Sequence, residues 1–116
     1  MDATDLPGYA ERLARGYDDF PDVMRLATWH RLERGSAMLV PAALESNRAK
    51  IDQIAGAQAA GLLTDRYPAG ALLGLILHIA ALWVSMPDEF AAVAGVPDAD
   101  ARAAFVRDAV HTLLAS

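Results

Sequence analysis

The chain has 116 residues, and ten Lys and Arg against fifteen Asp and Glu give it a formal net charge of −5. This acidic balance argues against duplex DNA as a direct partner, because nucleic-acid-binding surfaces are basic. The chain has no cysteine, which excludes a disulfide scaffold and a thiolate metal site.

The composition favours a single all-α domain that spans residues 1–116. Hydrophobic residues make up 54% of the chain but aromatic residues only 7%, because much of the apolar content is Ala and Leu, which favour helices. No segment alternates apolar and polar residues for long enough to predict a strand. We therefore expect helices and no sheet.

The first two helices are predicted from apolar spacing and from signals at their ends. Asp5 is a candidate N-cap for a helix over about 6–19, in which the apolar residues recur at helical spacing, namely Leu6, Tyr9, Leu13, Tyr17 and Phe20. Pro21 begins a second helix that ends near Gly35. The second helix is apolar on several faces, which predicts a central position.

A third helix begins at Pro41 and carries one apolar stripe. The stripe consists of Leu44, Ile51, Ile54, Ala55 and Leu62, and Gln58 lies on it as well. Two interpretations of Gln58 stay open. It is either a partly exposed glutamine near a helix end or a polar group that faces a cavity.

The stretch "PAGALLGLILHIAALWVSMP" is uncharged apart from one titratable residue, His78. A helix from Ala69 to Met86 would extend roughly 27 Å, close to the ~30 Å core of a bilayer. No Lys or Arg cluster flanks it, and His78 would lie at the bilayer midplane without an obvious partner. The start of the chain, "MDATDLPGYAERL", lacks the apolar region of a secretory signal. We expect a buried or interfacial helix of a cytoplasmic protein.

This fourth helix has two unlike faces when its residues are projected at 100° per residue. The bulky face carries Leu72, Leu75, Ile76, Ile79, Leu82, Trp83 and Met86, and the opposite face carries Gly70, Ala71, Gly74, His78, Ala81 and Ser85. The bulky face suits a core or a cavity wall, whereas small residues let a second helix approach closely. Either another helix of the chain or another protein copy could cover the small face, and we favour another copy.

The last part of the chain predicts a short helical turn after Pro87 and a final helix over about 98–115. One face of the final helix carries Phe105, Val106, Ala109, Val110 and Leu113, and the other carries Arg107, Asp108 and His111. The pattern thus gives five main helices.

The sequence predicts no catalytic centre, metal site or cofactor. It contains no HExxH motif, no glycine-rich phosphate loop and no GxSxG motif, and its three histidines lie on different predicted helices. His30 and Glu33 are three residues apart and could share a metal ion, but no third ligand accompanies them. A solvated His and Glu pair is the preferred interpretation.

The chain resembles the C-terminal regulatory half of TetR-family transcriptional repressors. "DLPGYAERLARGYDDFPDVMRLATWHRLERG" is similar to the two helices that follow the DNA-binding domain in that family. "IAGAQAAGLLTDRYPAGALLGLILHIAALW" is similar to the next pair. The resemblance implies five to six helices in an antiparallel bundle. The family's N-terminal helix-turn-helix domain is absent here. Either the chain is truncated to the regulatory domain or the natural protein lacks its DNA reader, and we favour truncation. We expect DNA to be contacted only through the missing domain.

The resemblance also implies an effector-binding and homodimerisation domain that senses a small, mostly apolar molecule. The candidate pocket residues are Tyr17, Met24, Trp29, Leu32, Gln58, Leu62 and Trp83. The candidate dimer interface consists of Gly70, Gly74, His78, Ala81, Phe105, Ala109 and Leu113. Two alternatives remain: a ligand-free dimerisation adaptor, and a small helical enzyme that uses His30 or His78.

Overall fold

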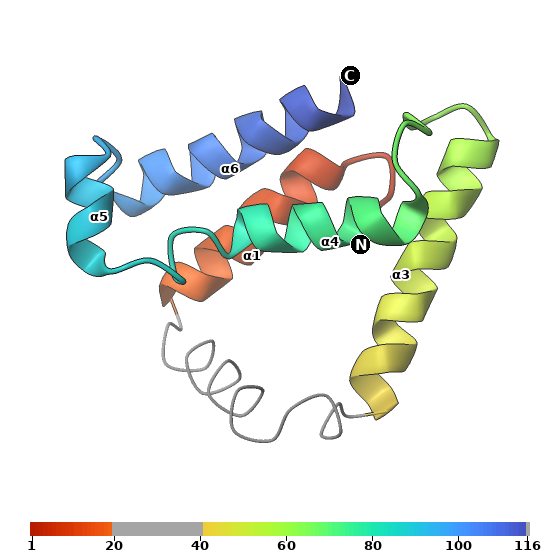
Figure 1. Cartoon of the computed structure of the whole chain (residues 1–116), viewed down its shortest axis with the longest axis horizontal. Helices are drawn as coiled ribbons and strands as arrows, with labels where there is room; N and C mark the ends of the chain where they lie inside the picture. The colour runs from red at the N-terminus through yellow and green to blue at the C-terminus, as the bar shows by residue number, and fades with distance from the viewer. Residues whose placement is uncertain (20–40, 116) are drawn as a thin grey trace.

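The computed structural model describes residues 1–19 and 41–115, and these form five helices and no strand (Figure 1). The helices are α1 (Leu6–Asp19), α3 (Pro41–Ala59), α4 (Ala69–Ala80), α5 (Asp88–Val93) and α6 (Ala99–Leu114). The predicted helix between Pro21 and Gly35 lies outside the described residues. The all-α prediction is confirmed.

Helix α1 begins and ends where the sequence predicted. The Gly8 amide donates a hydrogen bond to the Asp5 carboxylate at 3.2 Å, so Asp5 satisfies one of the free N–H groups at the start of the helix. The apolar side of α1 then buries Leu6, Tyr9, Ala10 and Ala14. This apolar face of α1 therefore packs into the centre of the bundle.

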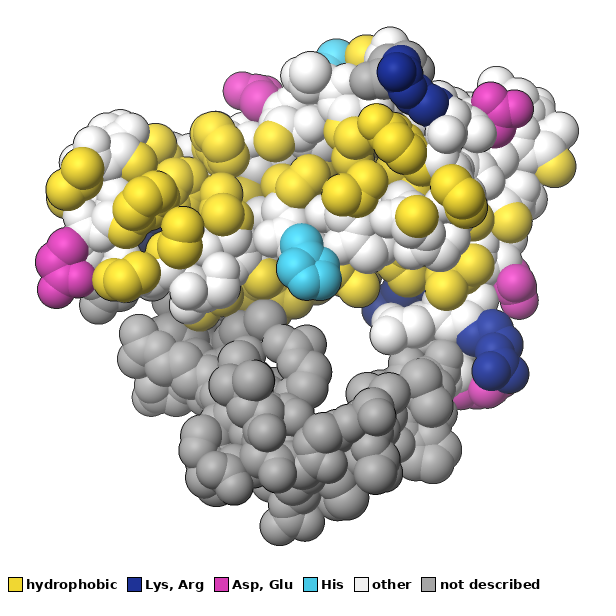
Figure 2. Space-filling model, viewed as in Figure 1, with side chains coloured by type: hydrophobic (Ala, Val, Ile, Leu, Met, Phe, Trp, Pro, Cys, Tyr) yellow, Lys and Arg dark blue, Asp and Glu magenta, His cyan; other side chains and the backbone are white. Residues whose placement is uncertain are grey.

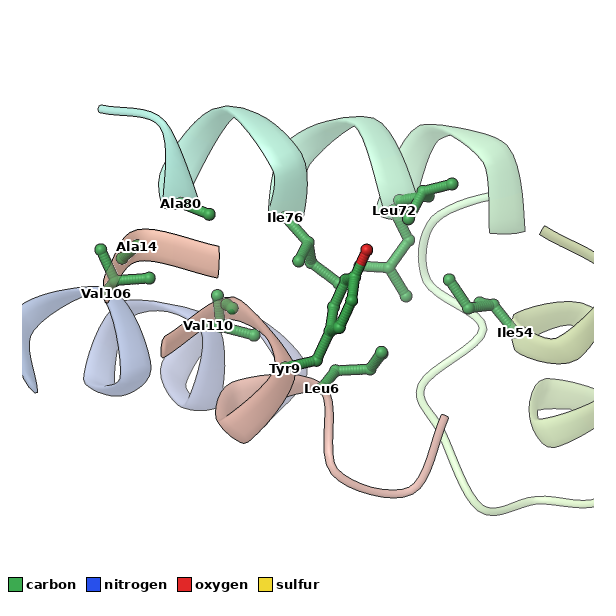
Figure 3. Packing of buried hydrophobic residues seen from close by; sticks show 11 residues of the cluster. Leu6, Tyr9, Ala14, Ile54, Leu72, Ile76, Ala80, Val106 and Val110 are labelled. Atoms are coloured by element: carbon green, nitrogen blue, oxygen red, sulfur yellow. The ribbon is translucent and has the colours of Figure 1, made fainter. Parts of the chain in front are cut away.

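The core is formed where α1, α4 and α6 meet, with one residue from α3 (Figure 3). Helix α4 contributes Leu72, Leu73, Ile76 and Ala80, α6 contributes Val106 and Val110, and α3 contributes Ile54. Full burial of one such aliphatic side chain favours folding by about 1.5–3 kcal/mol relative to exposure. The core therefore fixes one side of α4 against α1 and α6.

Interhelical ion pairs follow the boundary between α1 and α6. Glu11 pairs with Arg107 at 3.0 Å, Arg15 with Asp100 at 2.8 Å, and Asp18 with Arg102 at 3.2 Å. The start of α6 pairs with the second half of α1, and Arg107 further along α6 pairs with the earlier Glu11. The two helices therefore run antiparallel, as Figure 1 also shows.

Helix α3 packs on α4 with only part of the predicted stripe, in which Ile51 is partly buried against the core as predicted. Ile54 and Ala57 are buried, whereas Ala55 is exposed and Leu62 is 64% exposed. The helix ends before Leu62, because Gly61 takes a φ of 75° and the Leu62 amide donates back to the Ala57 carbonyl at 2.9 Å. The chain leaves the stripe at this turn.

Helix α4 is shorter than the sequence predicted, because it ends at Ala80 and not at Met86. Residues 81–85 continue as turns in which the Leu82 amide donates to the Ile79 carbonyl at 3.2 Å. The turns place Trp83 against the rings of Phe90 and Phe105. None of the described helices is long and apolar enough to cross a membrane.

Candidate functional site

The side of α4 that turns away from the core is apolar and open. Figure 2 shows hydrophobic side chains spread over this side of the molecule, with charged side chains mainly at its margins. We define the outward face of α4 as Gly70, Ala71, Gly74, Leu75, His78 and Ala81, all of which are exposed or partly exposed. Exposed apolar patches of this kind commonly mark interaction sites.

Leu75 belongs to this outward face, although the sequence placed it on the bulky side. It is 41% exposed, because the core takes Leu72, Leu73 and Ile76 from α4. The small residues Gly70, Ala71, Gly74 and Ala81 are exposed or partly exposed on the outward side, as the helical projection predicted.

The glycines leave room above the helix. A Cβ atom added at Gly74 would meet no other atom within 4 Å, and one added at Gly70 would meet only the Ile51 Cδ1 atom, at 3.6 Å. No packing within the described part of the chain therefore requires glycine at position 74. A helix of another molecule could approach α4 closely at this position.

His78 lies in the middle of the outward face and is exposed. Its Nδ1 atom is 2.9 Å from the Gly74 carbonyl oxygen, one turn earlier on α4. A carbonyl oxygen only accepts hydrogen bonds, so Nδ1 carries the hydrogen in this contact and Nε2 is free to accept one in the neutral ring. The ring thus offers an acceptor on an otherwise apolar face.

Helix α6 contributes the other predicted interface residues. Phe105 is 43% exposed, and Ala109 and Leu113 are partly buried. The Phe105 ring meets the Trp83 ring edge to face, with centroids 5.4 Å apart and an interplanar angle of 74°. Phe105 therefore has one side in contact with its own chain and one side open.

Trp83 is the centre of an aromatic cluster at the end of α4, which we define as Trp83, Phe90 and Phe105. The Phe90 ring centroid lies 6.2 Å from that of Trp83. The Trp83 Nε1 atom is buried and has no hydrogen-bond partner in the part of the chain that the structure describes. Phe90 joined no predicted site, because the sequence gave no reason to pair the short helix α5 with Trp83.

Tyr17 lies near the end of α1, partly buried and packed against the core. Burial raises the pKa of its hydroxyl above 10.0, because the charged phenolate is less well solvated there, and the nearby Tyr9 adds to this rise. At neutral pH Tyr17 is therefore a neutral phenol in apolar surroundings.

Gln58 has a structural role in this fold. Its Nε2 atom donates to the Tyr67 carbonyl at 2.9 Å and to the Thr64 carbonyl at 3.1 Å, and the side chain is partly buried. These bonds fasten the loop between α3 and α4. Both donors of the amide are engaged, so only the carbonyl oxygen of Gln58 could orient a ligand.

The predicted pocket residues do not all meet in one place. Gln58 and Leu62 lie before the start of α4, whereas Trp83 follows its end, and a helix of this length spans about 18 Å. Met24, Trp29 and Leu32 lie outside the described residues. A role in effector binding stays a prediction for each of the seven.

No candidate metal-binding site is found in residues 1–19 and 41–115. Within these ranges, no three His, Asp or Glu side chains lie close enough together to hold a metal ion. His30 and Glu33, the pair noted in the sequence, lie outside them.

The fold and the open apolar face define a helical domain, and comparison with known proteins identifies its class. The family described as "Tetracyclin repressor-like, C-terminal domain" matches residues 5–111. The HTH-type transcriptional repressor SCO4008 of Streptomyces coelicolor is 31% identical to the chain over 101 residues. That match covers 85% of this chain and 53% of the repressor, so the chain spans about half the length of this curated relative.

A solved structure agrees with the sequence match. The crystal structure of SCO4942 from Streptomyces coelicolor, described as a transcriptional regulator, superposes with a TM-score of 0.84 at 34% sequence identity. The superposition covers 97% of this chain and 62% of the other. The chain belongs to the TetR-type C-terminal domain family, as the resemblance of its sequence indicated. The two relatives are named as a transcriptional repressor and a transcriptional regulator.

Proposed function

We propose that this chain is the dimerisation and effector-binding domain of a TetR-family transcriptional regulator. The main observation in support of a dimer is the outward face of α4, which is mostly apolar, contains no Lys, Arg, Asp or Glu, and is open at Gly74. Two-fold dimers are the commonest oligomers and need one patch that complements itself. In this arrangement, Gly70, Gly74, His78 and Ala81 meet the same residues of a second copy.

Helix α6 completes the proposed interface. Phe105, Ala109 and Leu113 supply the bulk that the glycines of α4 lack, so that α4 and α6 of both copies form a four-helix contact. An obligate interface of this kind commonly buries about 2,000 Å² or more in total. DNA is contacted through a helix-turn-helix domain outside this chain, by analogy with the relative named as an HTH-type repressor.

The effector in this proposal is a small, mostly apolar molecule, and no bond is made or broken. Trp83 offers a broad apolar wall with one N–H donor, and Tyr17 offers a neutral phenol. The alternative is a dimerisation adaptor without a ligand, in which the aromatic residues only fill the core. An enzyme using His30 or His78 is less well supported, since no base and nucleophile pair accompanies either residue in the sequence.

The dimer is tested by sedimentation equilibrium of the wild-type chain and of Gly74→Leu. We expect a wild-type dimer at tens of micromolar and a folded, weakened dimer for Gly74→Leu, since the added side chain has room within one copy but not between two. Gly56→Leu is the matched control, because a Cβ there also meets nothing within 4 Å and α3 lies outside the proposed interface. A monomeric wild-type chain, or equal effects of both substitutions, would contradict the dimer.

The effector is tested by a broad screen of apolar compounds with thermal shift and tryptophan fluorescence as readouts. We expect at least one class of apolar compound to raise the unfolding temperature, because a ligand that binds only the folded state stabilises it. If no class changes either signal, the adaptor interpretation replaces effector sensing, and the dimer proposal is unaffected.

A further inference from the structure

The indole N–H of Trp83 is buried without a hydrogen-bond partner in the described part of the chain. Buried Trp N–H groups usually find an acceptor, and an unsatisfied one costs stability. Such a group in a native fold requires an explanation, of which an absent bound molecule is one. The donor is therefore available to a ligand that brings its own acceptor.

The walls around this donor are aromatic and partly open. Phe105 meets Trp83 edge to face and Phe90 is tilted at 36°, and the two phenylalanines remain 43% and 41% exposed. Rings in these geometries attract a further aromatic ring through edge and face contacts. The cluster thus combines an aromatic surface with a single hydrogen-bond donor.

Phe90 lies on a short helix that the other described helices do not support. Helix α5 has only six residues, its N-terminus has no side-chain cap, and it packs along none of the other described helices. Val93 on the same helix is 86% exposed. Figure 1 shows α5 at the edge of the molecule, beyond the end of α4. The side of the cluster formed by Phe90 is therefore its more adaptable side.

We propose that Trp83, Phe90 and Phe105 bind a neutral aromatic molecule with one hydrogen-bond acceptor, such as an aryl ketone, whose oxygen accepts the Trp83 N–H. This inference rests on the proposed effector-sensing function and names the chemical class that the site selects. The acceptor is neutral, because one N–H donor cannot replace the hydration of a buried carboxylate. The aromatic body packs against Phe90, because the open side of Phe105 belongs to the proposed dimer contact.

The test compares acetophenone with ethylbenzene, which have nearly the same shape but differ in the carbonyl oxygen. The chain has two tryptophans, and the indole N–H resonance that disappears in Trp83→Phe is assigned to Trp83, so in the wild-type chain this resonance reports on the site. We expect acetophenone to bind about five- to tenfold more tightly than ethylbenzene, the contribution of one neutral hydrogen bond. Acetophenone should also shift the indole N–H resonance, and ethylbenzene should shift it much less.

Two substitutions separate the donor from the aromatic walls. The affinities of each variant are measured by calorimetry. Trp83→Phe should remove the preference for acetophenone, whereas Phe90→Ala should weaken the binding of both compounds and keep the preference. Val93→Ala is the control on the same helix and should leave both affinities unchanged. Circular dichroism verifies that each variant is folded, and the resonance shift tests the donor without any substitution at Trp83.

Three results would overturn this inference, and each can be told apart from a failure of the proposed effector-sensing function. Equal binding of the two compounds with an unmoved N–H resonance means that the site senses apolar bodies without this donor. Failure of both compounds, with success of another class in the broad screen, rejects the site but keeps effector sensing. A Trp83→Phe variant that loses self-association and keeps its ligand preference places the acceptor on a second copy of the chain.

Discussion

Arg102 on α6 donates two hydrogen bonds to the carboxylate of Asp18 on α1, from Nη2 to Oδ1 at 3.2 Å and from Nε to Oδ2 at 3.4 Å. The two side chains are only 19% and 20% exposed. A two-pronged pair with this degree of burial is stronger than a surface ion pair, because water screens it less. It fixes the end of α1 to the beginning of α6.

Replacing Arg102 with Met should lower the free energy of unfolding by about 1–2 kcal/mol, between the values for exposed and fully buried pairs. Urea unfolding measures this change. A double-mutant cycle with Asp18→Asn should return a favourable coupling energy, since both single changes remove the same pair. Arg15→Met is the matched control, because Asp100 opposite Arg15 is 89% exposed, and a smaller loss is expected there. Additive effects in the cycle would show that the pair contributes nothing.

Gln58→Glu should destabilise the loop between α3 and α4. The substitution keeps the shape of the side chain but replaces the amide donor with a carboxylate oxygen that faces the Thr64 and Tyr67 carbonyls. The loss of these bonds in a partly buried position should cost about 1–3 kcal/mol of unfolding free energy. Chemical unfolding at neutral pH checks the value.

Gln53→Glu on the same helix is the matched control for this loop prediction, because Gln53 is exposed. We expect its effect to stay within about 0.5 kcal/mol of zero. Equal effects at the two positions would show that the bonds of Gln58 do not hold the loop.

The sequence predicted best those features that local signals determine. The bounds of α1 follow from the Asp5 cap and apolar spacing, and the final helix begins after Asp98, whose carboxylate accepts the Ala101 amide at 2.7 Å. Each of these signals acts within one turn of the chain. Local chemistry was therefore sufficient for the existence of the helices and for most of their ends.

Features that depend on contacts between distant residues were not predicted. The end of α4 at Ala80 accompanies the packing of Trp83 on Phe90 and Phe105, a contact that no spacing within α4 encodes. The exposure of Leu75 likewise depends on which side of α4 meets α1 and α6. The projection separated two faces of α4 but could not determine where the core boundary falls between them.

Tyr17 should titrate at higher pH than an ordinary tyrosine, because burial raises its pKa above 10.0. Above about pH 10 the unfolded chain loses this proton first while the folded chain retains it, so the free energy of unfolding decreases as the pH rises. Below that pH the contribution is fully present. The ultraviolet absorbance of tyrosinate should show a late component that Tyr17→Phe removes. A late component that persists in Tyr17→Phe would contradict the assignment.

Leu75→Arg tests the outward face of α4 with a charge instead of added bulk. Leu75 is exposed within one copy, so the substitution should leave the fold intact. Between two copies related by a two-fold axis, however, the new guanidinium would lie in an apolar contact near its own symmetry mate. The dissociation constant of the dimer should rise at least about hundredfold, since like charges across an interface cost several kcal/mol.

Leu62→Arg makes the same change at another exposed leucine, 64% exposed and in the loop after α3, outside the proposed interface, and should leave the dimer intact. Light scattering over a concentration series distinguishes the two variants. Because both carry the same added charge, a dimer that survives Leu75→Arg as well as it survives Leu62→Arg would place the contact on another surface of the domain.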